Sequence, residues 1–219
     1  MEITAYTLSI GPVTIDKSRF DKEEMGRNAL YMPDAEAAKK AQAYLEGCMK
    51  EKNSSGGMVE CVIKGVPAGI GEPAFEKLDA NLAKAVFSIG AVKSFEVGAG
   101  IAAASSDGLH NNDAYRMDEE GNVKKKTNHS GGITGGISDG APILIRAAFK
   151  PTPSVAAVQE TVNRQGENIE ISIKGRHDPI IVPRAVVVVE SMAALVVLDA
   201  MLGSMTTRMD AVKGFFKNL

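Results

Sequence analysis

The stretch SGGITGGISDGAPILIRAAFKPTPS, residues 130–154, contains a glycine-rich part, an alternating part and a proline-rich part. Residues 143–149 alternate between two faces, as the residues of a β-strand do. One face would carry Ile143, Ile145, Ala147 and Phe149, and the other Leu144, Arg146 and Ala148. Glycines before it and prolines after it are typical of segments that end a strand. The stretch therefore predicts a strand of a sheet that is bounded by loops on both sides.

Segments on either side predict both strands and helices. Residues 3–10 are rich in β-branched and aromatic side chains and end at Gly11-Pro12, which predicts a strand and a turn. Apolar residues at helical spacing follow Pro33 and Asp34 and predict an amphipathic helix, which the sequence NSSGG, residues 53–57, ends. The same criteria predict three further elements: strands over 58–64 and 169–174, the second with one face in water, and a helix over 78–89.

The order of these elements predicts the fold class. Strands and helices alternate along the chain in the order strand, helix, strand, helix, strand, long loop, strand, strand, helix, which suits layered sheets and helices rather than a helical bundle. No internal repeat and no linker interrupts the pattern. The sequence predicts an α+β protein that forms a single domain over residues 1–219.

The composition excludes several classes of protein. The chain has 219 residues, of which 44% are hydrophobic and 24% charged, as in ordinary globular domains, so wholesale disorder is excluded. A formal net charge of −2 and a pI of about 6.0 speak against a nucleic acid as partner. The first residues do not resemble a signal peptide, so we expect the protein to be cytoplasmic.

The cysteines predict no metal site and no disulfide framework. Cys48 and Cys61 stand in apolar patterns without the spacing of metal ligands, and we expect two buried free thiols.

One apolar stretch is almost long enough to cross a membrane. Residues 185–202 are apolar except for Glu190, Ser191 and Asp199. A carboxylate at the centre of a bilayer costs on the order of 3 kcal/mol, which favours a helix in a protein core or a subunit interface and predicts no contact with a membrane.

Two polar stretches leave alternatives open. Residues 105–128 lack periodicity and predict a long loop, in which the lysines at 124–126 indicate a solvated surface more than a phosphate site. The glycines between residues 131 and 140 allow backbone amides to approach a ligand, but tight turns between strands explain them equally well.

Two clusters could hold an anionic ligand. Lys150, Thr152 and Ser154 offer a cation and two hydroxyls on a loop stiffened by prolines, which suits a phosphate or merely the edge of a sheet. The sequence GRHDP, residues 175–179, places a cation, an imidazole and a carboxylate in a row between apolar segments, which favours a site over a surface turn. Asp178 or His177 is then available for proton transfer.

Taken together, the motifs resemble those of the chorismate synthase family. The resemblance rests on NHSGGITGGISDGAPILIRAAFKPTPS, on GRHDPIIVPRAVVVVESMAALVVLDAML and on VPAGIGEPAFEKLDANLAKAVFSIGAVKSFEVG, and it extends from Glu2 to the late apolar helix. It implies a layered β-α-β sandwich of antiparallel sheets and helices, assembled as a homotetramer.

The resemblance also implies a reaction. Members of this family are lyases of aromatic amino acid biosynthesis that catalyse the last step of the shikimate pathway. Enolpyruvylshikimate phosphate loses phosphate and a ring proton in an anti-elimination that gives chorismate. Reduced FMN is required although no net oxidation occurs, and NADPH serves to reduce the flavin only in bifunctional members.

Site residues are carried over position by position. Asp178 matches the acid beside the flavin and is the implied catalytic residue, and no metal site is implied. The implied flavin-binding residues are Gly90 and Ala91 of SIGAVK, Gly135 of GGITGG, Lys150, Pro151, Thr152, Pro153 and Ser154 of KPTPS, and Arg176 of GRHDP.

The sequence also departs from the family pattern. A GESHG-like motif, an arginine-rich stretch, a second histidine motif and an RGGGRSSAR-like flavin segment, which members carry in their first third, do not occur in these 219 residues. We therefore expect a C-terminal portion that is incomplete and inactive alone. The alternative is a non-catalytic folding and assembly fragment that retains the tetramer core.

Overall fold

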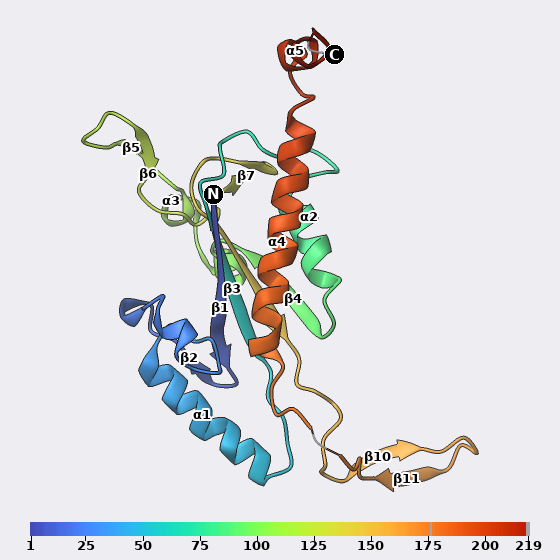
Figure 1. Cartoon of the computed structure of the whole chain (residues 1–219). Helices are drawn as coiled ribbons and strands as arrows, with labels where there is room; N and C mark the ends of the chain where they lie inside the picture. The colour runs from blue at the N-terminus through green and yellow to red at the C-terminus, as the bar shows by residue number, and fades with distance from the viewer. Residues whose placement is uncertain (176, 218–219) are drawn as a thin grey trace. The chain divides into compact units, whose positions relative to one another are not determined.

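The structure is a computed structural model that describes residues 1–175 and 177–217 (Figure 1). The chain divides into two compact units. Unit 1 consists of Met1–Ala5, Glu60–Ala147 and Val187–Leu219, and unit 2 consists of Tyr6–Val59 and Ala148–Val186. The single domain expected from the sequence stays a prediction.

The described residues form a mixture of strands, short 3₁₀ helices and α-helices. In chain order these are β1 (Glu2–Ile10), β2 (Val13–Thr14), η1 (Lys17–Arg19), η2 (Glu24–Gly26), α1 (Ala35–Lys50), β3 (Gly57–Lys64), α2 (Leu78–Phe87), β4 (Val92–Val97), η3 (Gly100–Ser105), α3 (Gly108–Asn111), β5 (Tyr115–Met117), β6 (Val123–Lys125), β7 (Ile133–Thr134), β8 (Ile137–Ser138), β9 (Ile143–Phe149), β10 (Gln159–Val162), β11 (Asn168–Ile171), α4 (Val182–Ser204) and α5 (Met209–Lys217).

The main sheet has five strands in the order β2-β1-β3-β9-β4. Three two-stranded antiparallel hairpins, β5–β6, β7–β8 and β10–β11, accompany it. Strands that are neighbours in the sheet are mostly distant in the sequence, as Figure 1 shows for β1 and β3. The predicted α+β class is confirmed.

The alternation that predicted β9 is visible in its burial. Ile143, Ile145, Ala147 and Phe149 are buried, and the three residues between them are half-buried. One of these, Arg146, donates to Glu60 at 2.6 Å and lies 3.5 Å from Glu96, so a charged side chain on the second face is paired within unit 1. The predicted strand and its two faces are confirmed.

Helix α1 begins where the sequence predicts it, at a buried aspartate. The Asp34 carboxylate accepts hydrogen bonds from the amides of Glu36 and Ala37 at 3.0 and 3.2 Å, as an N-cap does. The Arg19 guanidinium binds it with two nitrogens at 3.1 and 2.8 Å. Although burial opposes the shift, the Arg19 hydrogen bonds and those from main-chain amides hold the pKa of Asp34 well below its usual value.

The long helix α4 is buried on one face and exposed on the other. Val189, Ala193 and Val197 are buried, whereas Leu195 and Leu198 are 61% and 51% exposed. The Glu190 carboxylate accepts a hydrogen bond from the Ala5 amide of β1 at 2.8 Å, which ties the helix to a strand. By length and composition alone α4 passes for a membrane span, and 28% of its most apolar window is buried in the structure. The helix is therefore not enclosed in a core within the described residues, whereas the expected subunit interface stays a prediction.

The two cysteines are free and buried, as predicted. Burial, followed by the nearby carboxylates of Glu190 and Glu60, raises the pKa of the Cys61 thiol to about 12. Residues 1–175 and 177–217 contain no cluster of three or more His, Cys, Asp or Glu side chains able to hold a metal ion.

Two predictions about secondary structure were wrong. Residues 105–128 are not one long loop, because they contain α3 and the β5–β6 hairpin. The strand predicted over 169–174 is the shorter β11, and both of its faces are exposed because it pairs only with β10. Ile169 and Ile171 are therefore 38% and 44% exposed instead of forming a buried face.

Candidate functional site

The KPTPS segment follows β9 in unit 2 as a loop held from several sides. The Pro153 carbonyl accepts hydrogen bonds from the Val155 amide at 3.1 Å and from Gln159 Nε2 at 3.0 Å. Val155 is buried, whereas Lys150 is exposed at the point where the strand ends. The loop is thus fixed while its cation remains accessible.

A turn formed by residues 54–57 contacts both predicted clusters of unit 2. Ser54 Oγ donates to the Thr152 carbonyl at 2.7 Å, and the Ser55 amide donates to the Pro179 carbonyl at 2.8 Å. A Cβ atom on Gly56 would stand 2.5 Å from the Phe149 carbonyl oxygen, so only glycine allows this approach. The turn brings the KPTPS segment and the end of the GRHDP segment together.

The sequence predicted this turn only as the end of a helix. Its role was missed because Ser54 and Thr152 are 98 residues apart, a separation that local periodicity does not reach. The available signal was the pair of serines before two glycines, which offers hydroxyl donors beside a backbone that approaches closely.

The Thr152 hydroxyl is the clearest sign of a ligand in this loop. Its Oγ1 is buried and has no hydrogen-bond partner in the described part of the chain. Buried polar atoms in proteins are almost always hydrogen-bonded, so an unpaired one requires an explanation. A bound anion or carbonyl group beside Thr152 would supply the missing partner.

Asp178 forms an ion pair with the first turn of α4. Its two carboxylate oxygens lie 3.1 and 2.8 Å from two nitrogens of Arg184. His177 Nε2 lies 2.9 Å from the Ile173 carbonyl, so the imidazole has a main-chain partner. Arg176 lies outside the described residues.

The apolar surroundings predicted for the GRHDP segment are present on one side only. After it, Ile180 and Ile181 are half-buried and Val182 is buried. Before it, the exposed β11 supplies no buried wall, as described above. The prediction that apolar walls flank the cluster on both sides was therefore wrong.

The glycine segment of unit 1 forms tight turns. Gly135 and Gly136 connect β7 and β8 with φ angles of 62° and 87°, the left-handed values that a two-residue hairpin turn needs. A Cβ on Gly136 would stand 2.5 Å from the Glu72 carbonyl oxygen, but nothing lies within 4 Å of one on Gly135. The turn accounts for Gly136, whereas Gly135 borders open space.

Gly90 and Ala91 form the connection between α2 and β4, also in unit 1. Ala91 has a φ of 70°, which is rare for a residue with a side chain and occurs often at functional sites. No atom lies within 4 Å of the position of a Cβ on Gly90. These two residues thus combine a strained backbone with free space.

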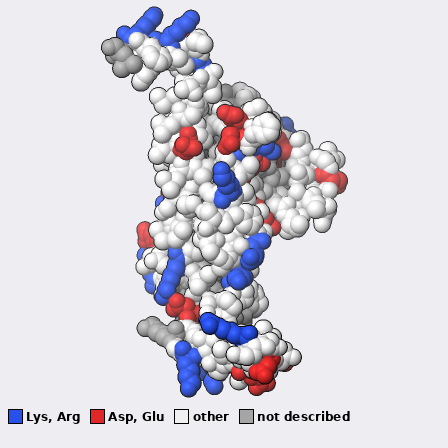
Figure 2. Space-filling view, turned by 90° about the vertical axis from the view of Figure 1, so that its right-hand side faces the viewer, with Lys and Arg blue, Asp and Glu red and all other residues white. Residues whose placement is uncertain are grey.

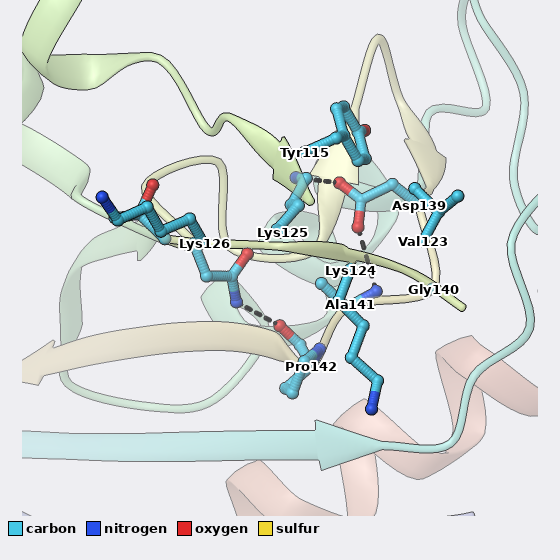
Figure 3. Close-up of a pocket in the computed structure, with 11 residues that line it drawn as sticks. Tyr115, Val123, Lys124, Lys125, Lys126, Asp139, Gly140, Ala141 and Pro142 are labelled. Atoms are coloured by element: carbon cyan, nitrogen blue, oxygen red, sulfur yellow. Dashed lines mark hydrogen bonds and ion pairs between the residues drawn. The ribbon is translucent and has the colours of Figure 1, made fainter. Parts of the chain in front are cut away.

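A second polar cluster surrounds Lys125 beside a cavity of about 480 Å³ (Figure 3). Lys125 Nζ donates hydrogen bonds to the Asp139 carboxylate and, at 2.6 Å, to Ser130 Oγ. It also lies 3.5 Å from the Asp113 carboxylate. Although burial raises the pKa of the Asp139 carboxyl, the hydrogen bonds from Lys125 and the Ala141 amide hold it below its usual value. One buried cation thus faces two carboxylates in this cluster.

The lysine run therefore divides into two kinds of residue. Lys124 and Lys126 are exposed, and Lys124 pairs with Asp118 at 2.6 Å, as expected of a solvated surface. The Lys125 side chain is only 6% exposed and is paired with two aspartates, so the same prediction was wrong for it. On the face drawn in Figure 2, charged side chains are scattered over a largely uncharged surface.

Comparison with known proteins agrees with the motifs. The family model described as chorismate synthase matches residues 1–202. The chorismate synthase of Agathobacter rectalis is 61% identical over 219 residues, and that of Lachnoclostridium phytofermentans is 59% identical over 217 residues. These alignments cover 100% and 99% of this chain but 59% of each relative.

A solved structure described as the crystal structure of chorismate synthase is also similar. It superimposes with a TM-score of 0.76 and 28% sequence identity, over 99% of this chain and 62% of that chain. The chain thus spans about three fifths of the length of the curated relatives named above. The chain belongs to the chorismate synthase family.

Proposed function

We propose that this chain forms part of a lyase that converts enolpyruvylshikimate phosphate to chorismate with reduced FMN. Family membership and the matching order of motifs support the reaction. A homotetramer and a cytoplasmic location are parts of the same proposal.

The observation that carries the proposal is the unpartnered Thr152 hydroxyl. It is buried beside the exposed Lys150 in a loop that Ser54 holds in place. A cation and a free hydroxyl on a fixed backbone fit an anionic cofactor such as FMN, whose phosphate and carbonyl oxygens accept hydrogen bonds. The residues present therefore fit the flavin that the family implies.

Lys150, Thr152 and Asp178 each have a role in the proposed reaction. Reduced FMN, when bound, supplies the electron that the elimination needs transiently. Lys150 and the Thr152 hydroxyl bind and orient the cofactor, and Asp178 holds or takes a proton at a flavin ring nitrogen. Arg184, which binds both Asp178 oxygens, fixes the orientation of that carboxylate.

Two measurements on the 219-residue chain test the proposal. In an anaerobic titration with reduced FMN we expect binding in the micromolar range, because the KPTPS loop is already ordered by Ser54 and Gln159. In an anaerobic assay with excess enolpyruvylshikimate phosphate we expect no turnover, because the histidine and arginine motifs of the family do not occur in the sequence. Absence of flavin binding would count against a role in this reaction.

The second candidate function is non-catalytic folding and assembly. It is favoured by the apolar side chains that α4 exposes, including Val187, Leu195 and Leu202 at 62%, 61% and 56%. Such a face is expected to be covered by other protein. A chain that self-associates but does not bind reduced FMN fits this candidate and not the first.

A further inference from the structure

We propose that Ser54 is a positioning residue for the cofactor loop, an inference that rests on the proposed function. Its hydroxyl fixes the Thr152 carbonyl and thereby the direction in which the Thr152 side chain projects. Ser54 lies in the turn after α1 and was not among the residues that the family resemblance implies.

The loop depends on such a contact because of its prolines. Pro151 and Pro153 carry no amide hydrogen, so the segment has few donors of its own. A residue that precedes a proline is restricted to extended conformations, which applies to both Lys150 and Thr152. With φ fixed at two positions and the neighbours restricted, one hydrogen bond to the Thr152 carbonyl sets the orientation of the central peptide.

The Ser54 bond has the geometry to do this. The distance from Ser54 Oγ to the Thr152 carbonyl oxygen is 2.7 Å, and the bond is partly buried. The turn is itself held, because Gly11 N donates to the Gly56 carbonyl at 2.9 Å and Ser55 N donates to the Pro179 carbonyl at 2.8 Å. Ser54 therefore connects the loop to a segment of unit 2 that is itself held by main-chain hydrogen bonds.

The consequence is a threonine whose two polar groups have different tasks. The carbonyl is occupied by Ser54, while the buried Oγ1 has no partner in the described part of the chain. Loss of the Ser54 hydroxyl lets the peptide between the prolines rotate, so that the Thr152 hydroxyl no longer points consistently toward a ligand. Affinity then falls without a change in the residues that touch the ligand.

Ser172 provides a matched control in the same unit. Its hydroxyl also donates to a main-chain carbonyl, that of Ala156, at 2.9 Å, but on an exposed part of the chain. The test therefore compares Ser54→Ala, Ser54→Thr and Ser172→Ala in the 219-residue chain. The threonine variant keeps the hydroxyl and tests for rescue.

The first readout is hydrogen exchange without ligand at the Val155 amide, which donates to the Pro153 carbonyl of the loop at 3.1 Å. We expect Ser54→Ala to accelerate exchange of this amide about tenfold, Ser54→Thr to restore it, and Ser172→Ala to leave it unchanged. Equal exchange in wild type and Ser54→Ala would overturn the proposal. So would an increase spread evenly over the whole chain, since that would show a general loss of stability. If Ser54→Ala does not fold, Ser54→Cys, which keeps the size with a weaker donor, takes its place.

The second readout is the affinity for reduced FMN. We expect about tenfold weaker binding by Ser54→Ala, with near wild-type affinity in the other two variants. Unchanged affinity despite faster loop exchange would overturn the role toward the cofactor. If the wild-type chain binds no reduced FMN, the proposed function fails, whereas the exchange data still decide whether Ser54 positions the loop.

Discussion

Asp34 shows how one buried carboxylate organises the start of an element. It caps α1 and also accepts a hydrogen bond from the Asp16 amide at 2.9 Å, while Arg19 binds both of its oxygens. Asp34→Ala removes all of these contacts, and we expect the free energy of unfolding at pH 7 to fall by about 2 kcal/mol. Chemical denaturation measures this difference, and Asp21→Ala, which removes an exposed aspartate of the same region, is the control.

The contribution of Asp34 should depend on pH. Its pKa in the folded chain lies below the ordinary value of an aspartate, so the folded state binds fewer protons than the unfolded state in acid. The stabilisation is therefore complete above about pH 5 and is lost as the pH falls through the ordinary value toward the folded one. We therefore expect the difference in free energy of unfolding between wild type and Asp34→Ala to shrink as the pH falls from about 5 to about 3. A difference that stays constant would contradict this explanation.

Asp178 is the residue to which the proposed chemistry assigns a proton. Asp178→Asn preserves the shape of the side chain, so in a complete enzyme we expect the rate of chorismate formation to fall at least about a hundredfold with little change in stability. The complete enzyme is a chimera that joins this chain to the part of the Agathobacter rectalis relative that it does not match. Asp210→Asn is a matched control, because Asp210 also pairs with an arginine through both oxygens at 3.1 and 2.6 Å. A wild-type rate in Asp178→Asn would remove this carboxylate from the mechanism.

At the scale of the element, the two glycines of the β7–β8 turn differ in the space around them. Gly136 is closely surrounded, whereas no atom lies within 4 Å of the position of a Cβ on Gly135. We expect Gly136→Ala to lower the free energy of unfolding by about 2 kcal/mol or more. The new Cβ atom would clash with the Glu72 carbonyl oxygen, and this adds to the backbone strain at positive φ. Gly135→Ala carries only the strain of its φ, about 1 kcal/mol. Denaturation of both variants measures the difference, and equal losses would show that space around the turn has no influence.

The elements that local pattern predicts are those in which burial follows the sequence. Strand β9 alternates between its faces and α1 follows an N-cap, and both were predicted within a few residues. The β5–β6 hairpin and strand β10 were not predicted, because these short exposed strands show no contrast between a buried and a solvated face. Strand β11 was predicted from its alternating isoleucines, but both of its faces are exposed. Periodicity reports burial, and these hairpins have little of it.

The site shows the same limit over longer distances. The KPTPS and GRHDP segments were identified from residue types, but the Ser54 contact between two loops depends on the folded chain. Lys125 is a similar case, since its burial follows from pairing with Asp139 and not from the lysine run itself. Residue type predicted the chemistry, whereas tertiary contacts decide which residues support it.

For the whole molecule, the exposed apolar face of α4 predicts association. Leu195 and Leu198 lie on this face, and an exposed apolar surface of this kind is expected to be covered by protein. We expect the 219-residue chain to sediment as an oligomer and the double variant Leu195→Glu, Leu198→Glu to sediment as a monomer. Val158→Glu, at a site that is 65% exposed on another segment, is the control. A monomeric wild type would indicate that a different cover, such as the remaining part of a family member, belongs on α4.

The most direct test of the account is chorismate formation by the chimera under anaerobic conditions. Reduced FMN and enolpyruvylshikimate phosphate are supplied in excess, and the intact Agathobacter rectalis relative is assayed in parallel. The account predicts that the chimera forms chorismate, because this chain contributes the KPTPS loop, Asp178 and the fold of the family. A folded chimera that binds reduced FMN but forms no chorismate, beside an active relative, would contradict it.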